Sequence, residues 1–168
     1  HQNQHKKMVI DSRDGLVHGI VGAKTYSELP NVEVAKWAMS AHAELRFTGG
    51  WVCGPAIRMT TTLKTLDKDV QPKVGDIVQF GTDVWSAVNG DASVNINDYC
   101  YRLVCKNGMR ARDAQHCSRV VHRGEAAHHV QKAIIDSAFR AEFMVPLIGK
   151  ASAHLLTADE VTAIRAYL

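Results

Sequence analysis

Regular alternation of apolar and polar residues predicts β-strands through the middle of the chain. In residues 76–88 the apolar or small side chains occupy every second position and share one face of a strand: Val78, Phe80, Thr82, Val84, Ser86 and Val88. Residues 51–66 are rich in β-branched and apolar side chains and predict another strand, with Gly54 and Pro55 as a bulge or edge within it. Residues 118–123 are consistent with one more short strand.

The strand predicted at residues 92–105 changes its alternation part-way along. Its apolar residues first lie at even positions, Val94 and Ile96. Later they lie at odd positions: Tyr99, Tyr101, Leu103 and Cys105. A bulge near residues 97–98 would bring both halves to the same face of the sheet, so we predict one there.

Turn residues predict two β-hairpins. Asp14 and Gly15 lie between two short apolar runs near the start of the chain. Asn89, Gly90 and Asp91 separate the strands predicted at residues 76–88 and 92–105. Asn-Gly and Asp-Gly pairs favour the tight turns that join antiparallel strands, because these residues tolerate positive φ.

Helical periodicity predicts three helices. The first covers residues 32–47, with Asn31 as its N-cap, residues 48–50 as its end, and the apolar stripe Val34, Ala38, Ala41 and Leu45. The second runs from residue 124 to about 145, before Pro146, with the stripe Val130, Ile134, Ala138, Ala141 and Val145. The third covers residues 157–168 and begins at the capping box Thr157 and Glu160.

This order of elements predicts an α+β fold. We expect an antiparallel β-sheet with an N-terminal hairpin, one helix inserted between strands, and a long C-terminal helix packed on one face. Residues 8–168 are expected to form a single domain, and the polar residues 1–7 a disordered tail. No apolar run is long enough to span a bilayer. The spacing of Cys53, Cys100, Cys105 and Cys117 fits no disulfide scaffold, which favours reduced thiols and a cytoplasmic location.

Positive charge is concentrated in residues 102–123. That segment holds six Lys or Arg residues and one acid, Asp113, a local charge of +5. The whole chain carries only +3, so the remainder carries −2. A local basic patch of this kind is suited to a polyanionic partner.

The basic residues crowd the corner that follows Cys105. A two-residue hairpin turn at Asn107 and Gly108 would set Arg110 and Arg112 on the face where Leu103 and Cys105 are expected to seek the core. Because burying unpaired guanidinium groups is costly, we expect the chain to turn away from the sheet instead, through a short helical turn at residues 109–114. Such a corner would present cations at the edge of a rigid sheet.

The chain also resembles a known family. Residues 101–109, YRLVCKNGM, with SAVNGDASVNI before them and RVVHRG after them, are similar to a phage- and plasmid-type family described as domain of unknown function 932. The similarity covers roughly residues 8–140 and implies family-motif positions at Tyr26, Asn31, Gly49, Gly50, Gly90, Arg102, Cys105, Asn107 and His122. Two positions depart from its pattern: HRGEA stands where relatives often have His-Thr and an Asn, and Asn107 is followed by Gly rather than Thr.

Binding of single-stranded DNA or RNA without sequence preference is the main functional hypothesis. Phosphate contacts need accessible cations, and the candidates are Arg102, Lys106, Arg110, Arg112, Arg119 and Arg123. Trp85 is a candidate for base stacking, whereas Tyr99 and Tyr101 are expected in the core. No zinc-finger or RNA-recognition motif is present, so binding should be directed at the backbone. The outline is similar to single-strand annealing proteins of the Red-beta type, which suggests annealing by a homo-oligomer.

Other functions are less well supported by the sequence. The Cys and His residues do not have the spacing of a zinc site, and Cys105 with His122 lacks the surroundings of a nucleophilic pair, so we expect no metal, no cofactor and no catalytic residues. The alternative hypothesis is a protein-interaction or regulatory module with no role in nucleic-acid binding. A metal-dependent nuclease is a distant third.

Overall fold

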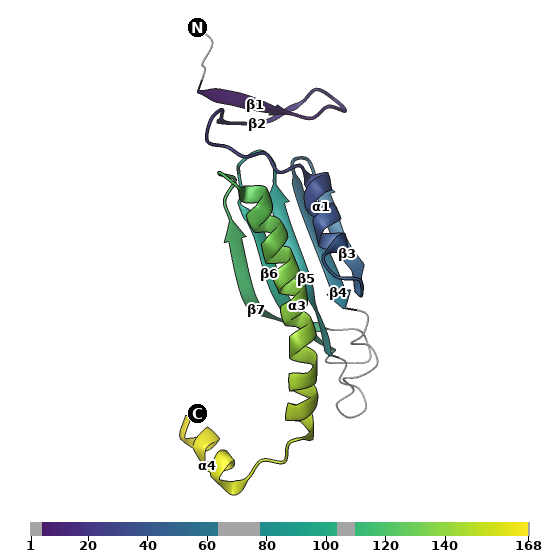
Figure 1. Cartoon of the computed structure of the whole chain (residues 1–168), viewed down its shortest axis with the longest axis vertical. Coiled ribbons are helices and arrows are strands. Elements are labelled where there is room, and N and C mark those ends of the chain that lie inside the picture. Colours follow the sequence, from purple (N-terminus) through teal and green to yellow (C-terminus); the bar gives the residue numbers. More distant parts are fainter. Residues whose placement is uncertain (1–4, 64–77, 104–109, 168) are drawn as a thin grey trace.

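The computed structural model describes residues 5–63, 78–103 and 110–167, which form two antiparallel sheets and three helices (Figure 1). The hairpin of β1 (Lys6–Ile10) and β2 (Val17–Gly22) is followed by α1 (Asn31–Ser40). The large sheet contains β3 (Leu45–Cys53), β4 (Ala56–Leu63), β5 (Val78–Ala87), β6 (Val94–Leu103) and β7 (Arg110–Val120). The helices α3 (Ala126–Ala153) and α4 (Ala158–Tyr167) come after it.

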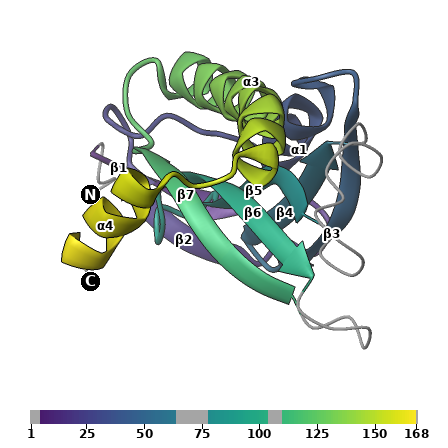
Figure 2. The same cartoon turned by 90° about the horizontal axis from the view of Figure 1, so that it is seen from below.

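The five strands of the large sheet lie in sequence order, and each pair of neighbours is antiparallel. The β1–β2 hairpin lies across one end of this sheet (Figure 1). Seen along the strands, α1 and α3 both cover the same face (Figure 2). The α+β class, the N-terminal hairpin, the inserted helix and the long helix packed on the sheet are therefore confirmed.

The core fills the space between these helices and the sheet. Val34 and Ala38 of α1, together with Val130 and Ile134 of α3, pack on the even-numbered side chains of β5 and β6 and on Ile57 and Met59 of β4. Polar contacts also cross this interface: Thr82 and Ser137 share a hydrogen bond of 2.6 Å, and Arg140 Nε donates to Asp98 Oδ2 over 2.6 Å. The face predicted for residues 76–88 is confirmed at Phe80, Thr82, Val84 and Ser86, and the stripe predicted for the long helix at Val130, Ile134, Ala138 and Ala141.

Several predicted boundaries are wrong at residues 31–56. Helix α1 ends at Ser40, and Gly49 and Gly50, predicted to end it, lie within β3. Gly54 and Pro55 form the turn between β3 and β4, since Cys53 pairs with Ala56. Asn31 does not cap α1: its Nδ2 donates to the Pro55 carbonyl over 3.0 Å, which ties the start of the helix to that turn.

The predicted departure of the chain after β6 is also wrong. β7 begins at Arg110 and pairs back along β6, with Leu103 opposite Arg110 and Tyr101 opposite Arg112. The bulge lies where expected along β6, between Asp98 and Tyr99 in the β6–β7 register, but the extra residue, Gln115, is on β7. The segment 104–109 itself lies outside the described residues.

The two halves of β6 therefore do not share a face. Asp98 faces α3, where it meets Arg140, and Cys100 packs with Phe80 and Ala138 on the same side. Strand alternation then places Tyr99 on the face away from the helices. It is buried there because its ring crosses Gly81 and its hydroxyl donates to the Thr61 carbonyl over 2.7 Å.

The ends of the chain differ from expectation in smaller ways. Lys6 and Lys7, assigned to the tail, belong to β1. Helix α3 continues through Pro146 and extends beyond the sheet (Figure 1). The capping box of α4 is confirmed, with the Thr157 amide donating to Glu160 over 2.8 Å. Within the described part of the chain, no helix combines the length and apolarity needed to cross a membrane.

Candidate nucleic-acid interface

One row of side chains crosses the face of the large sheet that α1 and α3 leave uncovered. Register pairs Trp51 with Arg58, Arg58 with Trp85, Trp85 with Asn95, and Asn95 with Arg119. Directly paired residues of antiparallel strands point to the same face. The five strands therefore contribute one residue each to a continuous row: Trp51, Arg58, Trp85, Asn95 and Arg119. We call this row the aromatic–basic row.

Both tryptophans of the row are accessible. Trp51 is 45% exposed and Trp85 is 40% exposed, although Trp85 is on the central strand. Neighbouring strands are about 4.8 Å apart, so the two indoles stand on backbones roughly 10 Å apart. Large aromatic side chains on a sheet face are usually covered, so an exposed pair in one row is a candidate binding surface.

Arg58 is held between the two tryptophans by a buried carboxylate. Its Nε donates to Asp83 Oδ1 over 3.0 Å and its Nη2 donates to Asp83 Oδ2 over 3.0 Å. Asp83 is nearly fully buried and also accepts from Thr60 Oγ1. A bidentate pair of this kind fixes the guanidinium plane, so Arg58 is a rigid part of the row and its charge is largely neutralised.

Arg46 and Arg119 supply charge at the two edges of the same face. Arg46 is exposed on β3 and pairs in register with Thr62. Arg119 is exposed on β7, and its Nε donates to Ser93 Oγ over 2.6 Å. Among the described residues neither forms an ion pair with a carboxylate, so both charges are available to a ligand.

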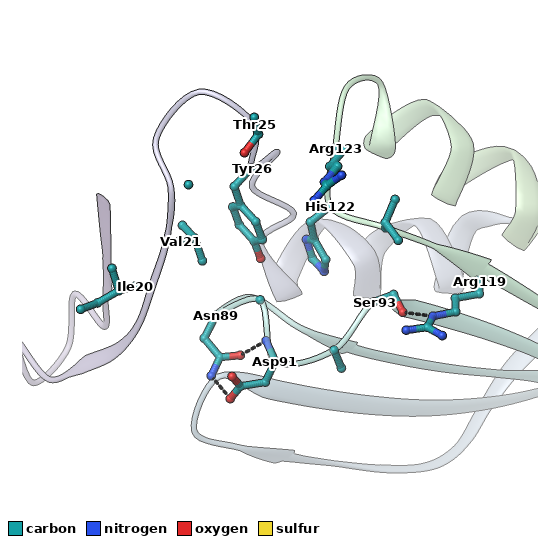
Figure 3. A pocket seen from close by; sticks show the side chains of 14 residues that line it. Ile20, Val21, Thr25, Tyr26, Asn89, Asp91, Ser93, Arg119, His122 and Arg123 are labelled. Carbon is teal, nitrogen blue, oxygen red and sulfur yellow. Dashed lines mark hydrogen bonds between the residues drawn. The ribbon is translucent and has the colours of Figure 1, made fainter. Parts of the chain in front are cut away.

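A pocket of about 590 Å³ opens beside Arg119, at the end of the sheet that carries the β1–β2 hairpin (Figure 3). Its walls come from β2 and the following loop, from the β5–β6 turn, and from the end of β7. Its lining includes Ile20, Val21, Tyr26, Asp91, Arg119, His122 and Arg123.

Tyr26 and His122 hold the hairpin, the β5–β6 turn and the end of β7 together. Their rings stack with centroids 4.9 Å apart and planes 8° apart. The Tyr26 hydroxyl donates to the Val88 carbonyl over 2.7 Å, and burial raises the pKa of Tyr26 to about 12, so it remains a donor at neutral pH. Gly90, with φ of +85°, makes the turn beneath the Tyr26 ring, where a Cβ would also lie 3.1 Å from Val21.

The structure brings some of the sequence-predicted residues together. Trp85 and Arg119 share the aromatic–basic row, while Arg119, Arg123, Tyr26, Gly90 and His122 surround the pocket. Arg102 belongs to β6, and Arg110 and Arg112 belong to β7. The structure describes only the backbone of these three residues. Lys106, Cys105 and Asn107 lie outside them entirely.

Comparison with family models gives one match. The model described as "Domain of unknown function (DUF932)" matches residues 17–151. The chain belongs to the DUF932 family. No curated protein matches it, and no solved structure does. The DUF932 match spans β2 to most of α3, so the aromatic–basic row and the pocket both lie within the family's own part of the fold.

Sequence reasoning missed Trp51, Arg46 and Arg58 of this DUF932 domain. Residues 51–66 were interpreted as one continuous strand. Trp51 and Arg58 were therefore placed on the same strand, and their pairing between β3 and β4 could not be inferred. The signal that would have found the row is the Gly54–Pro55 turn: once it is taken as a hairpin, Trp51 and Arg58 become cross-strand neighbours.

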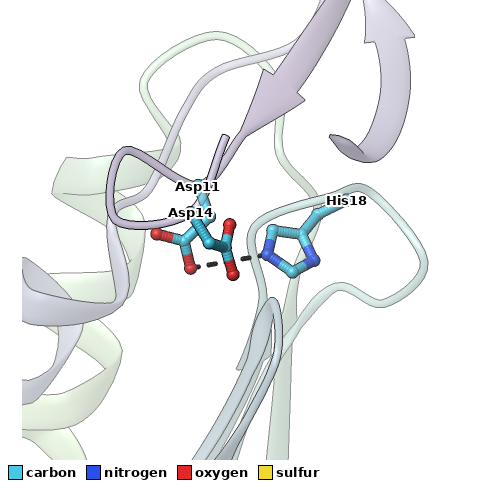
Figure 4. A group of neighbouring side chains, drawn as sticks. All are labelled: Asp11, Asp14 and His18. Atoms are coloured by element: carbon cyan, nitrogen blue, oxygen red, sulfur yellow. Dashed lines mark ion pairs between the residues drawn. The ribbon is translucent and has the colours of Figure 1, made fainter. Parts of the chain in front are cut away.

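Sequence reasoning also did not single out a group of possible metal ligands in the β1–β2 hairpin (Figure 4). Ligand atoms of Asp11, Asp14 and His18 lie within 4.8 Å of one another. Arg13, however, donates from Nε to Asp11 Oδ1 over 3.0 Å, and this contact holds the pKa of Asp11 well below its usual range. The Arg13 guanidinium already neutralises the Asp11 carboxylate. We therefore interpret Asp11, Asp14 and His18 as part of an ion-pair network that stabilises the hairpin, not as a metal site.

Proposed function

We propose that this DUF932 domain binds single-stranded nucleic acid, without sequence preference, across the open face of its large sheet. The observation that carries the proposal is the aromatic–basic row, with two exposed tryptophans separated by a fixed arginine and flanked by free cations. Proteins that bind single strands combine stacking side chains with a basic surface that follows the backbone.

The geometry favours a single strand over a duplex. Indole rings that stand on a sheet can stack only on bases that are unpaired and turned outward. A duplex hides its bases in its own stack and could use only the cations. Asn95, the row's one neutral polar side chain, donates from Nδ2 to the Ser93 carbonyl over 2.9 Å, which engages one of its two N–H donors within the domain. Stacking and charge accept any base, so recognition of particular bases is not expected.

Fluorescence anisotropy with labelled oligonucleotides tests the proposal. We expect a single strand to bind more tightly than the matching duplex, with affinity falling as salt rises. Heparin, a polyanion without bases, should compete weakly. Equal binding of heparin and the single strand would contradict a role for stacking. A domain that binds only proteins would bind none of these ligands and would not be retained on DNA cellulose.

The edge cations should set the salt dependence. Replacing Arg46 and Arg119 with alanine removes two phosphate contacts, and each contact to a single strand contributes about 0.7 to the slope of log K against log salt. We therefore expect the slope to fall by about 1.4. Arg165→Ala, an exposed arginine of α4, is the matched control and should leave the slope unchanged.

An unaltered slope in the Arg46→Ala, Arg119→Ala double variant would contradict phosphate binding at this face. The melting temperature should change little, because both side chains are exposed. The same measurement on Arg110→Ala with Arg112→Ala tests the sequence-based hypothesis for those two residues.

The biological setting is part of the same proposal. We place the domain in the cytoplasm, as a phage or mobile-element protein that promotes strand annealing as a homo-oligomer. Exposed apolar side chains on the part of α3 nearest α4, Phe139, Phe143 and Leu147, offer a surface for a second copy. Light scattering at increasing protein concentration tests this: a monomer at all concentrations would contradict it.

A further inference from the structure

The pocket beside the row has the features of a small-molecule site. Its volume, about 590 Å³, lies within the range of ligand pockets in proteins, roughly 300–1,000 Å³. Two cations, Arg119 and Arg123, and one acid, Asp91, line it, so its fixed charge is +1. Ile20 and Val21 of β2 line it with apolar residues, Val21 buried and Ile20 exposed. Cations, an acceptor and apolar residues therefore meet in one cavity (Figure 3).

His122 leaves one buried ring nitrogen for a ligand. The side chain is only 6% exposed, and its Nδ1 lies 3.3 Å from the Ser27 carbonyl. The Ala92 carbonyl also lies near the ring, so either nitrogen can carry the hydrogen of the neutral ring, and Nε2 can act as donor or acceptor. Nε2 forms no hydrogen bond of normal geometry with the described residues. A buried polar atom without a partner is rare and points to a missing one.

We propose that this pocket binds a free nucleoside monophosphate. The phosphate group would lie against the Arg119 and Arg123 guanidinium groups. The Arg119 side chain is oriented by the hydrogen bond from its Nε to Ser93 Oγ. Its two terminal nitrogens form no hydrogen bond with the described residues and can contact a phosphate. Asp91, which would repel a phosphate, is held by Asn89 within the β5–β6 turn and is suited to accept from sugar hydroxyls.

The other walls suit the nucleoside. His122 Nε2 would share a hydrogen bond with the nucleoside, and the apolar residues of β2 that line the pocket would contact its base. Inorganic phosphate alone would use only the cations, and adenosine alone would use only the remaining walls. The inference goes beyond binding at the sheet face, because neither tryptophan of the row lines the pocket, although Arg119 belongs to both sites.

Isothermal titration calorimetry with AMP, adenosine and inorganic phosphate tests the site. We expect saturable binding of AMP at one site, tighter than binding of either fragment. Arg123→Ala should weaken AMP about tenfold, the usual scale for a lost charge-assisted hydrogen bond. Ile20→Glu, at a 62% exposed position that lines the pocket, should weaken it as well, because a carboxylate would replace the apolar contact assigned to the base and would lower the positive charge of the pocket. Arg165→Ala and Val17→Glu, the latter an exposed residue of β2 outside the pocket, are the controls.

Three outcomes would overturn the inference. They are absence of AMP binding, equal affinity for AMP and inorganic phosphate, and AMP binding that Arg123→Ala and Ile20→Glu leave unchanged. Absence of AMP binding together with occupation of the site by a 5′-phosphorylated oligonucleotide would identify the ligand as a strand end. Oligonucleotide binding without AMP binding would remove only this inference, and AMP binding without oligonucleotide binding would remove only the sheet-face proposal.

Discussion

Replacing Trp51 and Trp85 together with alanine should weaken binding of a single-stranded oligonucleotide by at least about 30-fold. Stacking of one base on an aromatic side chain contributes about 1–3 kcal/mol, so the loss of two platforms should cost about 2 kcal/mol or more. The slope of log K against log salt should not change, because the double variant keeps every charge. Anisotropy titrations at several salt concentrations measure both quantities.

The unchanged slope separates stacking from charge. A site that recognised only negative charge would lose little oligonucleotide affinity on removal of the tryptophans. For this domain we expect the double variant to lose oligonucleotide affinity and to keep its affinity for heparin. Phe47→Ala is the matched control, because Phe47 is an exposed aromatic of β3 that pairs with Thr61, on the face of the sheet that the helices cover. Equal losses in the control and the double variant, or a Kd within twofold of the wild-type domain, would exclude the row as the binding surface.

Local periodicity was sufficient to predict most elements of the fold. The even positions of β5 alternate without interruption, and the stripe of α3 repeats every third or fourth residue, so one face of each is buried whatever its partner. The boundaries near α1 could not be predicted in the same way. Apolar spacing at Ala41 and Leu45 fits a helix as well as the start of a strand, and the chain resolves this only by pairing Leu45 with Leu63.

The sharpest error, at the start of β7, came from assigning the wrong face to β6. Tyr99 and the residues that alternate with it were assumed to face the helical core because they are large and apolar. Tyr99 is instead buried on the open face by Gly81, whose missing side chain makes room for the phenol ring. The face that Tyr99 occupies depends on a glycine in a neighbouring strand, and no pattern within β6 reveals it.

The candidate site could be predicted only in part for the same reason. Trp85, Arg119 and His122 were identified one at a time, from charge, aromaticity or family resemblance. Their grouping depends on the register of five strands and on where the hairpin lies, which are long-range properties of the fold. The stacked Tyr26 and His122 show this best: each is a motif position in the sequence, and only the structure shows that they share one cavity.

Gly50→Ala should lower the melting temperature by roughly 5–10 °C, from a loss of about 2–3 kcal/mol. A Cβ at this position would lie 2.3 Å from the Arg58 carbonyl oxygen and 3.2 Å from the Met59 Cα. Both atoms belong to the backbone of β4, so no side-chain rotation can relieve the contact and the two strands must separate locally. Because Trp51 and Arg58 lie beside the contact, oligonucleotide affinity should fall as well.

The neighbouring glycine provides the control. A Cβ at Gly49 would meet no atom within 4 Å, so Gly49→Ala should melt within about 2 °C of the wild-type domain, as expected of a surface substitution. Calorimetric melting of the two variants side by side decides the matter. Equal melting temperatures would show that β3 and β4 are not in close contact at Gly50. That result would also contradict the pairing of Trp51 with Arg58, on which the aromatic–basic row depends.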